Sequence, residues 1–380
     1  MQTPENLEAV DEGKAYQAQY RSADADRRAE RNARSIAMNA QQCSEAPITS
    51  AASETVWTFS PEALSPGDLV AVAVGSDDVF SGSFEISADG VLRLPHLNGV
   101  TALGRRASEL ETEIAQRLVR EGFYRRAPRI SVRLADRAPA RVFVAGAVFE
   151  AGQYNVGGVS GDDRDLTRQD ALGDGNSGRT LSTALRSAGG VRPDADLSRV
   201  RLARGGKTRV LDMSGAIDGR AFEDVSLISG DRIEVPSRGC FQERLMVPNA
   251  ISPPGISVYM SNLTKPADAN ALSAIGKETR EMPYGTRFLQ AVVKMNCAGG
   301  TQVTNADRYA VLFSRNPITG TSVLIERRVE DLLRRADRDE LDPFLLPEDA
   351  IACFDSTVTN ITEVAKSIAI VLGTGVLLAI

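Results

Sequence analysis

Two stretches of the 380-residue sequence have the same order of elements, and this repeat constrains the fold more than any single motif does. Each stretch has an opening strand, a helix that ends in Ala-Gly-Gly, two strands joined by a turn, and a closing strand. The copies span residues 141–236 and 257–355, with the helices "TLSTALRSAGG" and "TRFLQAVVKMNCAGG". The sequence therefore predicts two structural repeats with one strand order.

Apolar residues recur at helical spacing in both Ala-Gly-Gly segments. We expect each helix to bury one face and to end in a left-handed glycine, at Gly189 and at Gly299. The predicted buried faces are Leu181, Ala184, Leu185 and Ala188 in the first copy, and Phe288, Ala291, Val292 and Met295 in the second. The copies also close alike, with "LISGDRIEVP" and "LLPEDAIACF".

Another module precedes the repeats. It opens with "LSPGDLVAVAVG", in which a Pro-Gly-Asp turn precedes a β-rich run, and continues with "FEISADGVLRLPHLNGV". We expect a tight hairpin here, in which Asp89 and Gly90 supply the positive φ angles. A helix with Ser108 as its N-cap is expected to follow. Its predicted apolar face consists of Leu110, Ile114 and Leu118.

The module that opens with "LSPGD" resembles the polysaccharide export domain. The two Ala-Gly-Gly copies resemble the soluble-ligand-binding β-grasp domains that accompany it in outer-membrane polysaccharide exporters, although "SNLTKPADAN" in the second copy is a poor version of the Gly-rich opening. The resemblance implies an α+β fold: a polysaccharide export domain followed by two β-grasp-like repeats and a C-terminal amphipathic transmembrane helix. The expected divisions are a flexible or helical N-terminal segment at 1–55, the export domain at 56–136, β-grasp domains at 141–236 and 257–355, and a pore helix at 358–380.

The stretch "VTNITEVAKSIAIVLGTGVLLAI" separates polar and apolar residues onto two sides of a helix. From Val358 to Ile380 such a helix is about 34 Å long, close to the roughly 30 Å of bilayer hydrocarbon, and a ring of copies would turn its polar side toward a water-filled lumen. The predicted pore-lining residues are Thr359, Thr362, Glu363, Lys366, Ser367 and Thr374, and the predicted lipid-facing residues are Ile361, Val364, Ile368, Val371 and Leu372. A helix packed on the protein's own core and a helix lying flat at the interface remain alternatives.

Four cysteines lie far apart in the sequence, without a C-x-x-C pair, so a zinc site is not expected and up to two disulfides are. Cys297 and Cys353 both lie in the second copy and are one candidate pair. Cys43 and Cys240 are the complementary candidate pair. An exported protein can retain such bonds.

The composition and motifs exclude several other functions. The net charge is −6, so the chain has no basic excess for binding nucleic acid. No P-loop, G-x-S-x-G or H-E-x-x-H motif occurs, and we expect neither catalysis nor a cofactor. The single histidine, His96, is expected to have a structural or surface role rather than a catalytic one. The carboxylates in "GGVSGDDRDLTRQDALGDGNSG" lack the EF-hand order, so no metal site is expected.

The resemblance and the terminal pattern lead to one functional hypothesis. The chain would be a non-catalytic, oligomeric conduit in the outer membrane for capsular polysaccharide or exopolysaccharide, with most of its residues in the periplasm. Expected partners are further copies in a homo-oligomeric ring, the polysaccharide, outer-membrane lipid, and an inner-membrane polysaccharide co-polymerase or transporter component. The alternatives are a periplasmic carbohydrate-binding or adaptor module that forms no pore, and an enzyme acting on polysaccharide.

Overall fold

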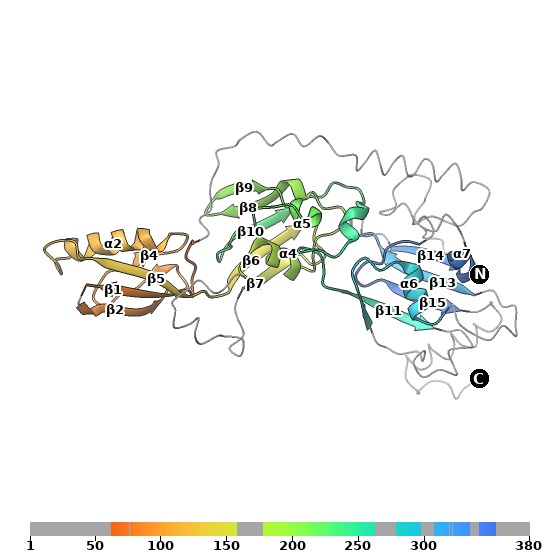
Figure 1. Cartoon of the computed structure of the whole chain (residues 1–380), viewed down its shortest axis with the longest axis horizontal. Coiled ribbons are helices and arrows are strands. Elements are labelled where there is room, and N and C mark those ends of the chain that lie inside the picture. Colours follow the sequence, from red (N-terminus) through yellow and green to blue (C-terminus); the bar gives the residue numbers. More distant parts are fainter. Residues whose placement is uncertain are drawn as a thin grey trace, which may run out of the picture. The chain divides into compact units, whose positions relative to one another are not determined.

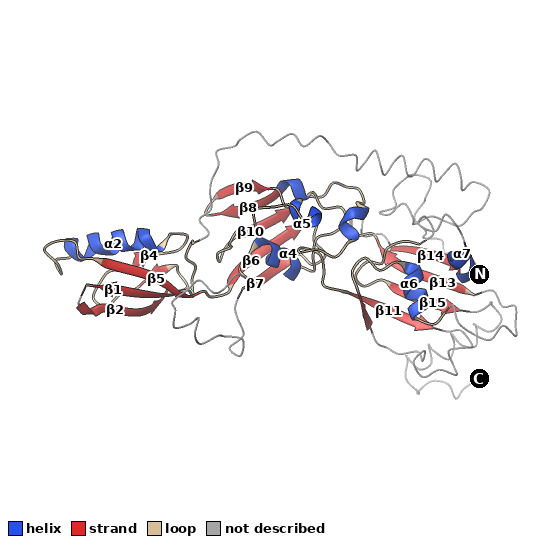
Figure 2. Ribbon diagram, in the orientation of Figure 1, coloured by secondary structure: helices blue, strands red, loops and turns tan. Residues whose placement is uncertain are grey.

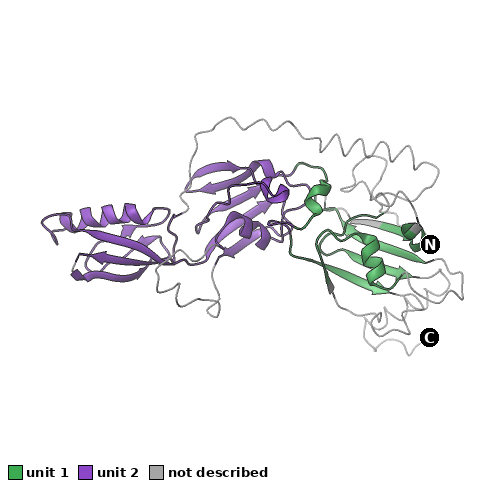
Figure 3. Cartoon of the chain, in the orientation of Figure 1, with its two compact units in different colours: residues 1–45, 238–248, 253–380 green, residues 46–237, 249–252 purple. Residues whose placement is uncertain are grey.

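The chain divides into two compact units, which Figure 3 colours separately. Unit 1 comprises residues 1–45, 238–248 and 253–380, and unit 2 comprises residues 46–237 and 249–252. The structure is a computed structural model that describes residues 62–75, 77–157, 178–262, 279–297, 308–318, 320, 322–334 and 342–354. Within these, unit 2 contains the N-terminal module (residues 62–136) and the first repeat (140–237), and unit 1 contains the second repeat (256–354).

The N-terminal module is a small antiparallel sheet covered by one helix (Figure 1). In its three-stranded sheet β1 lies between β2 and β5. Alternate residues of β1 are buried, and they share one hydrophobic core with the apolar face predicted for helix α2. The elements are β1 (Leu69–Val74), β2 (Asp77–Glu85), the short pair β3 (Val91–Leu92) and β4 (Val100–Thr101), α2 (Ala107–Arg120) and β5 (Ile130–Asp136).

Two local predictions for this module are wrong. At the Asp-Gly turn only Gly90 has a positive φ, of 76°, and the turn closes with a hydrogen bond from the Gly90 amide to the Ser87 carbonyl at 2.8 Å. A Cβ on Gly90 would lie 2.6 Å from the Leu103 Cβ, so packing as well as φ requires glycine there. Helix α2 begins after Arg106 rather than after Ser108, and Arg106 forms an ion pair with Glu109 in the first turn.

The first repeat is a five-stranded sheet with a helix, α4, on one face (Figure 2). Its strand order is β7-β6-β10-β8-β9, in which the closing strand β10 runs parallel to β6 and antiparallel to β8. The elements are β6 (Ala140–Gly146), β7 (Gly152–Val156), α4 (Leu181–Ser187), the 3-10 turn η4 (Leu197–Arg199), β8 (Val200–Arg204), β9 (Lys207–Leu211), α5 (Gly215–Asp218) and β10 (Arg232–Val235).

The second repeat has the same topology. Its strand order is β12-β11-β15-β13-β14, with β15 parallel to β11 and antiparallel to β13. The two stretches are therefore structural repeats, as their shared pattern predicted. The elements are β11 (Ile256–Asn262), β12 (Thr279–Met282), α6 (Phe288–Lys294), β13 (Tyr309–Arg315), β14 (Ser322–Arg328), α7 (Val329–Arg334) and β15 (Ala350–Phe354), preceded in unit 1 by the 3-10 turn η5 (Glu243–Met246).

The helical faces predicted from periodicity are buried in both repeats. Helix α4 ends as predicted, because Gly189 follows its C-cap with a φ of 70°. Helix α6 ends earlier than expected. Asn296, with a φ of 58°, takes the left-handed position there, and asparagine tolerates that conformation better than most residues do. Gly299 lies outside the described residues.

Cys297 and Cys353 form a disulfide with a Cα–Cα distance of 6.1 Å, and both cysteines are fully buried. The bond joins the end of α6 to β15 within the second repeat, and it is the pairing considered for that copy. Cys240 is also disulfide-bonded, whereas Cys43 lies outside the described residues.

The described residues have the mixed helix and strand composition of the expected α+β class. No helix among them is both long enough and apolar enough to cross a bilayer. The terminal helix predicted at residues 358–380 lies outside the described part of the chain.

Candidate functional site

One tight turn occurs three times in the chain, once in each module. It has the form "LSPGD" at residues 64–68, "LISGD" at 227–231 and "LLPED" at 345–349. In each turn the residue before the aspartate has a positive φ: 85° at Gly67, 97° at Gly230 and 68° at Glu348. Each turn leads directly into a core strand: β1, β10 or β15.

The aspartate side chain closes this turn in the same way each time. A carboxylate oxygen accepts a hydrogen bond from the backbone amide three residues earlier, at 2.8 Å for Asp68, 2.9 Å for Asp231 and 2.8 Å for Asp349. All three carboxyl groups are buried. A buried carboxylate needs further partners to offset its desolvation, so what distinguishes the three turns is what else each aspartate contacts.

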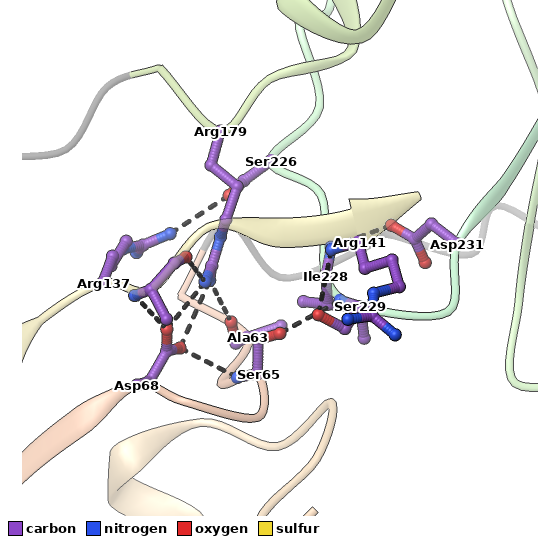
Figure 4. A network of polar contacts seen from close by, with 11 residues as sticks. Ala63, Ser65, Asp68, Arg137, Arg141, Arg179, Ser226, Ile228, Ser229 and Asp231 are labelled. Atoms are coloured by element: carbon purple, nitrogen blue, oxygen red, sulfur yellow. Dashed lines mark hydrogen bonds and ion pairs between the residues drawn. The ribbon is translucent and has the colours of Figure 1, made fainter. Parts of the chain in front are cut away.

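In the N-terminal module the partner comes from the first repeat. Arg179 lies two residues before the start of α4. Its Nη1 atom is 2.7 Å from the Oδ1 atom of Asp68, and its Nη2 atom is 3.3 Å from Oδ2 (Figure 4). The side chains are only 1% and 0% exposed. This two-point ion pair joins residues 111 positions apart in the sequence and ties the two modules of unit 2 together.

Backbone groups complete the joint around this pair. Arg179 also donates to the carbonyl oxygens of Ala138, at 3.1 Å, and Ala63, at 3.3 Å. The Ala138 amide in turn donates to Asp68 Oδ1 at 2.9 Å. Asp68 is therefore held from both sides, by its own turn and by the segment that links the two modules.

A second set of contacts runs beside the buried pair (Figure 4). The Ser229 amide donates to the Ser65 hydroxyl at 3.0 Å, which connects the turn of the first repeat with the turn of the N-terminal module. Arg137 donates to the Ser226 hydroxyl at 3.1 Å. Two of the three recurring turns thus lie against each other in the joint.

Two glycines let the backbone approach closely at this place. A Cβ on Gly67 would lie 2.8 Å from the Ala138 Cβ, and one on Gly157 would lie 2.9 Å from the Arg179 Cβ. Both glycines also have positive φ angles, of 85° and 80°. Any other residue at either position would separate the modules or strain the backbone.

The contacts of the joint indicate a structural role, which is to hold the two modules together. Neither charged side chain reaches solvent, so neither can meet a substrate. Removing one partner of such a pair leaves an uncompensated buried charge and typically costs about 3–5 kcal/mol. The described residues also contain no group of three or more His, Cys, Asp or Glu side chains that could hold a metal ion.

The predicted pore-lining and lipid-facing residues all fall between positions 358 and 380, outside the described residues. His96 is exposed and adopts a φ of 60°. The pair of Asp68 and Arg179 was missed by sequence reasoning. The threefold recurrence of the turn was a usable signal for the aspartate, but nothing in the sequence pattern indicated its arginine.

Comparison with known proteins identifies a family that the N-terminal module matches. The profile of the family described as "Polysaccharide biosynthesis/export protein" matches residues 60–135. The chain carries a polysaccharide export domain. The resemblance to outer-membrane polysaccharide export proteins that the sequence suggested is therefore confirmed.

Two curated relatives extend the similarity beyond this domain. Both are named "EPS I polysaccharide export outer membrane protein EpsA". The protein from Ralstonia solanacearum is 27% identical over 191 residues, which cover 48% of this chain and 45% of the relative. The protein from Ralstonia nicotianae (strain ATCC BAA-1114 / GMI1000) is 27% identical over 157 residues, or 41% of this chain and 36% of the relative. The chain thus spans less than half the length of the curated relatives it matches.

Proposed function

We propose that this protein is a non-catalytic, oligomeric conduit that passes capsular polysaccharide or exopolysaccharide across the outer membrane, with most of the chain in the periplasm. The observation that carries the proposal is the export domain at residues 60–135, followed by two repeats of one topology. The names of the two relatives, which are polysaccharide export proteins of the outer membrane, support the same function.

The proposed mechanism assigns a role to each part. Copies of the chain form a ring, and the buried joint fixes the export domain against the first repeat so that every copy presents the same surface to its neighbour. The amphipathic segment 358–380 contributes one helix per copy to a membrane pore with a polar lumen. A hydrated polysaccharide needs no chemical step to pass, and an inner-membrane co-polymerase or transporter supplies the energy.

Deletion of residues 358–380 tests the pore. We expect the truncated chain to fold, because the cores of the three modules are complete among the residues before 355. Export of surface polysaccharide should stop in a strain that carries only this variant, because the apolar segment proposed to cross the bilayer is gone. Normal surface polysaccharide from the truncated protein would contradict the pore and favour the periplasmic adaptor.

A matched pair of substitutions locates the two sides of the proposed helix. Ile368→Asp places a charge on the side predicted to face lipid, where it costs a few kcal/mol, and Ser367→Asp places the same charge on the side predicted to face water. We expect only Ile368→Asp to abolish the large detergent-solubilised particle in size-exclusion chromatography. Equal behaviour of the two variants would refute the assignment of the faces.

A further inference from the structure

The first repeat contains a polar cleft of about 280 Å³ at the edge of its sheet. One wall is strand β9 from Arg209 into Asp212, and the opposite wall is the segment from Arg220 to Glu223. Gly215 in α5 lets the backbone of α5 approach the Arg220 segment closely, since a Cβ there would lie 2.7 Å from the Arg220 carbonyl oxygen. The volume is just below the ~300 Å³ at which pockets for drug-sized ligands begin, so the cleft suits a ligand of about one sugar ring.

Charged side chains in the cleft are already positioned by one another. Arg209 forms a two-point ion pair with Glu223, with Nη1 2.7 Å from Oε1, and only 17% of the Arg209 side chain is exposed. Arg220 pairs with Asp218 at 2.6 Å. Asp212 accepts a hydrogen bond from the Ser214 amide at 2.8 Å. The cleft therefore offers fixed donors and acceptors around its opening.

The second repeat shows that this polarity is not required by the fold. By strand register Arg209 lies opposite Leu202 of β8, which lies opposite Ile233 of β10. The corresponding row in the second repeat is Ile325, Leu312 and Ile351. Ile325 is buried there as part of the core. The first repeat has a paired arginine at a position where the same topology accepts an isoleucine.

The lining chemistry indicates the class of ligand. The cationic side chains Arg209 and Arg220 are paired with the carboxylates of Glu223 and Asp218, and Asp212 adds a further carboxylate, so an anionic ligand gains no net attraction. Half-buried Phe222 lies among these polar groups and provides an apolar surface. A neutral pyranose combines hydroxyl groups along its edge with apolar C–H faces, and it matches both features.

We propose that this cleft binds one neutral pyranose unit of the transported polysaccharide. The proposal rests on the proposed function for the source of the sugar, but the cleft and its test are independent of pore formation. A polysaccharide that touches such a weak site in each copy of a ring would be held in register without being trapped, because each contact is small and can exchange with the next.

Saturation-transfer difference NMR on the full chain tests the site with glucose, galactose, mannose and N-acetylglucosamine as probes. At least one of these sugars should receive saturation from the wild-type protein. Glu223→Gln, which removes the partner of Arg209, and Phe222→Ala, which removes the apolar surface, should each lower that signal at least threefold. Glucuronate should give no stronger signal than glucose, because both arginines of the cleft are already paired with carboxylates.

Glu234→Gln is the matched control. It breaks an exposed ion pair with Arg201, at 3.2 Å, in the same repeat but outside the cleft. Its signal should equal that of the wild type. The proposal is overturned if none of the four sugars receives saturation, or if Glu234→Gln loses as much signal as Glu223→Gln. Because Glu223 is exposed, its variant should keep the wild-type circular dichroism spectrum, which separates lost binding from lost folding.

The outcome can be separated from that of the proposed function. If the chain binds sugar but supports no export, the proposed sugar site stands and the proposed conduit is refuted. If the wild type binds no sugar and the Glu223→Gln chain exports polysaccharide at the wild-type rate, the proposed conduit stands and the proposed sugar site is refuted.

Discussion

The two repeats share one topology and one closing turn, but the buried aspartate of that turn has different partners in each. In the first repeat Arg204 lies beside Asp231, with two contacts of 2.8 and 2.7 Å to its carboxylate. In the second repeat the residue that corresponds to Arg204 is Ser314. Arg204 follows Ala203, which pairs with Arg232 at the start of β10. Ser314 follows Phe313, which pairs in the same way with Ala350 at the start of β15.

The exchange of Arg204 for Ser314 leaves the aspartate of the second repeat with a different set of partners. Within the described part of the second repeat no lysine or arginine forms an ion pair with Asp349, and burial raises the pKa of its carboxyl to about 7. Hydrogen bonds from the Leu346 amide and from Ser314 lower the pKa only in part. The same position in the fold thus holds an aspartate that is paired with an arginine in one copy and an aspartate with a raised pKa in the other.

The largest expected effect comes from breaking the pair in the first repeat. Asp231→Asn should destabilise that repeat by about 3–5 kcal/mol, because the guanidinium of Arg204, which is only 10% exposed, loses its charge partner. Hydrogen–deuterium exchange should show lost protection in β8 and β10. Asp218→Asn, which breaks the exposed pair with Arg220, is the control and should change stability by less than about 1 kcal/mol. Equal effects of the two variants would refute the distinction between buried and exposed pairs.

The same substitution in the second repeat should have the opposite sign at pH 8. The pKa of Asp349 is raised from 3.8 to about 7 in the folded protein, so the folded state binds the proton more tightly than the unfolded state does. The stability of this repeat should therefore be greatest below about pH 4, fall as the pH rises to about 7, and stay constant above that value. A difference of about three in pKa corresponds to roughly 4 kcal/mol.

Asp349→Asn removes the ionisable group but retains an acceptor for the Leu346 amide. We expect this variant to be more stable than the wild type at pH 8, and the gain to vanish toward pH 4. Protection factors for β13 and β15, corrected for the intrinsic pH dependence of exchange, measure the difference. Asp331→Asn on the exposed face of α7 should leave the pH profile unchanged. A wild-type profile that is flat between pH 4 and 8 would contradict the raised pKa.

The covalent difference between the repeats gives the next effect. Cys353 in β15 corresponds by register to Val235 in β10, so the disulfide is a feature of the second repeat that the topology does not require. Replacing both Cys297 and Cys353 with alanine should destabilise this repeat by about 2–5 kcal/mol, because the bond closes a long loop of 56 residues.

The readout is exchange protection in α6 and β15, and the first repeat, which holds neither cysteine, is the internal control. The double variant is preferable to a reducing agent, because Cys240 is disulfide-bonded too. Unchanged protection in the double variant would show that the packing around α6 alone holds the second repeat together.

Sequence reasoning succeeded where the cause of a structure was local. The buried faces of α4 and α6 follow from the 3.6-residue spacing of their apolar residues, which can be read directly from the sequence. It failed at the start of α2, where Arg106 rather than Ser108 precedes the helix, although serine is the better capping residue. The joint could not be predicted because residues distant in the sequence form it. Asp68 and Arg179 are 111 residues apart, and neither carries a local mark of its partner.

The smallest expected effect concerns the residue that precedes the two aspartates. Gly230 and Glu348 occupy the same left-handed position, with φ angles of 97° and 68°, but only glycine adopts this conformation without a penalty. Glu348→Gly should therefore stabilise the second repeat by about 1 kcal/mol, and Gly230→Glu should destabilise the first by about as much. No atom lies within 4 Å of a Cβ built on Gly230, so the reciprocal change tests backbone strain without a steric clash. Thermal unfolding of the two variants, each followed through exchange in its own repeat, should show shifts of opposite sign. If both variants shift stability in the same direction, the turn of the second repeat is held by its surroundings rather than by the preference of its backbone.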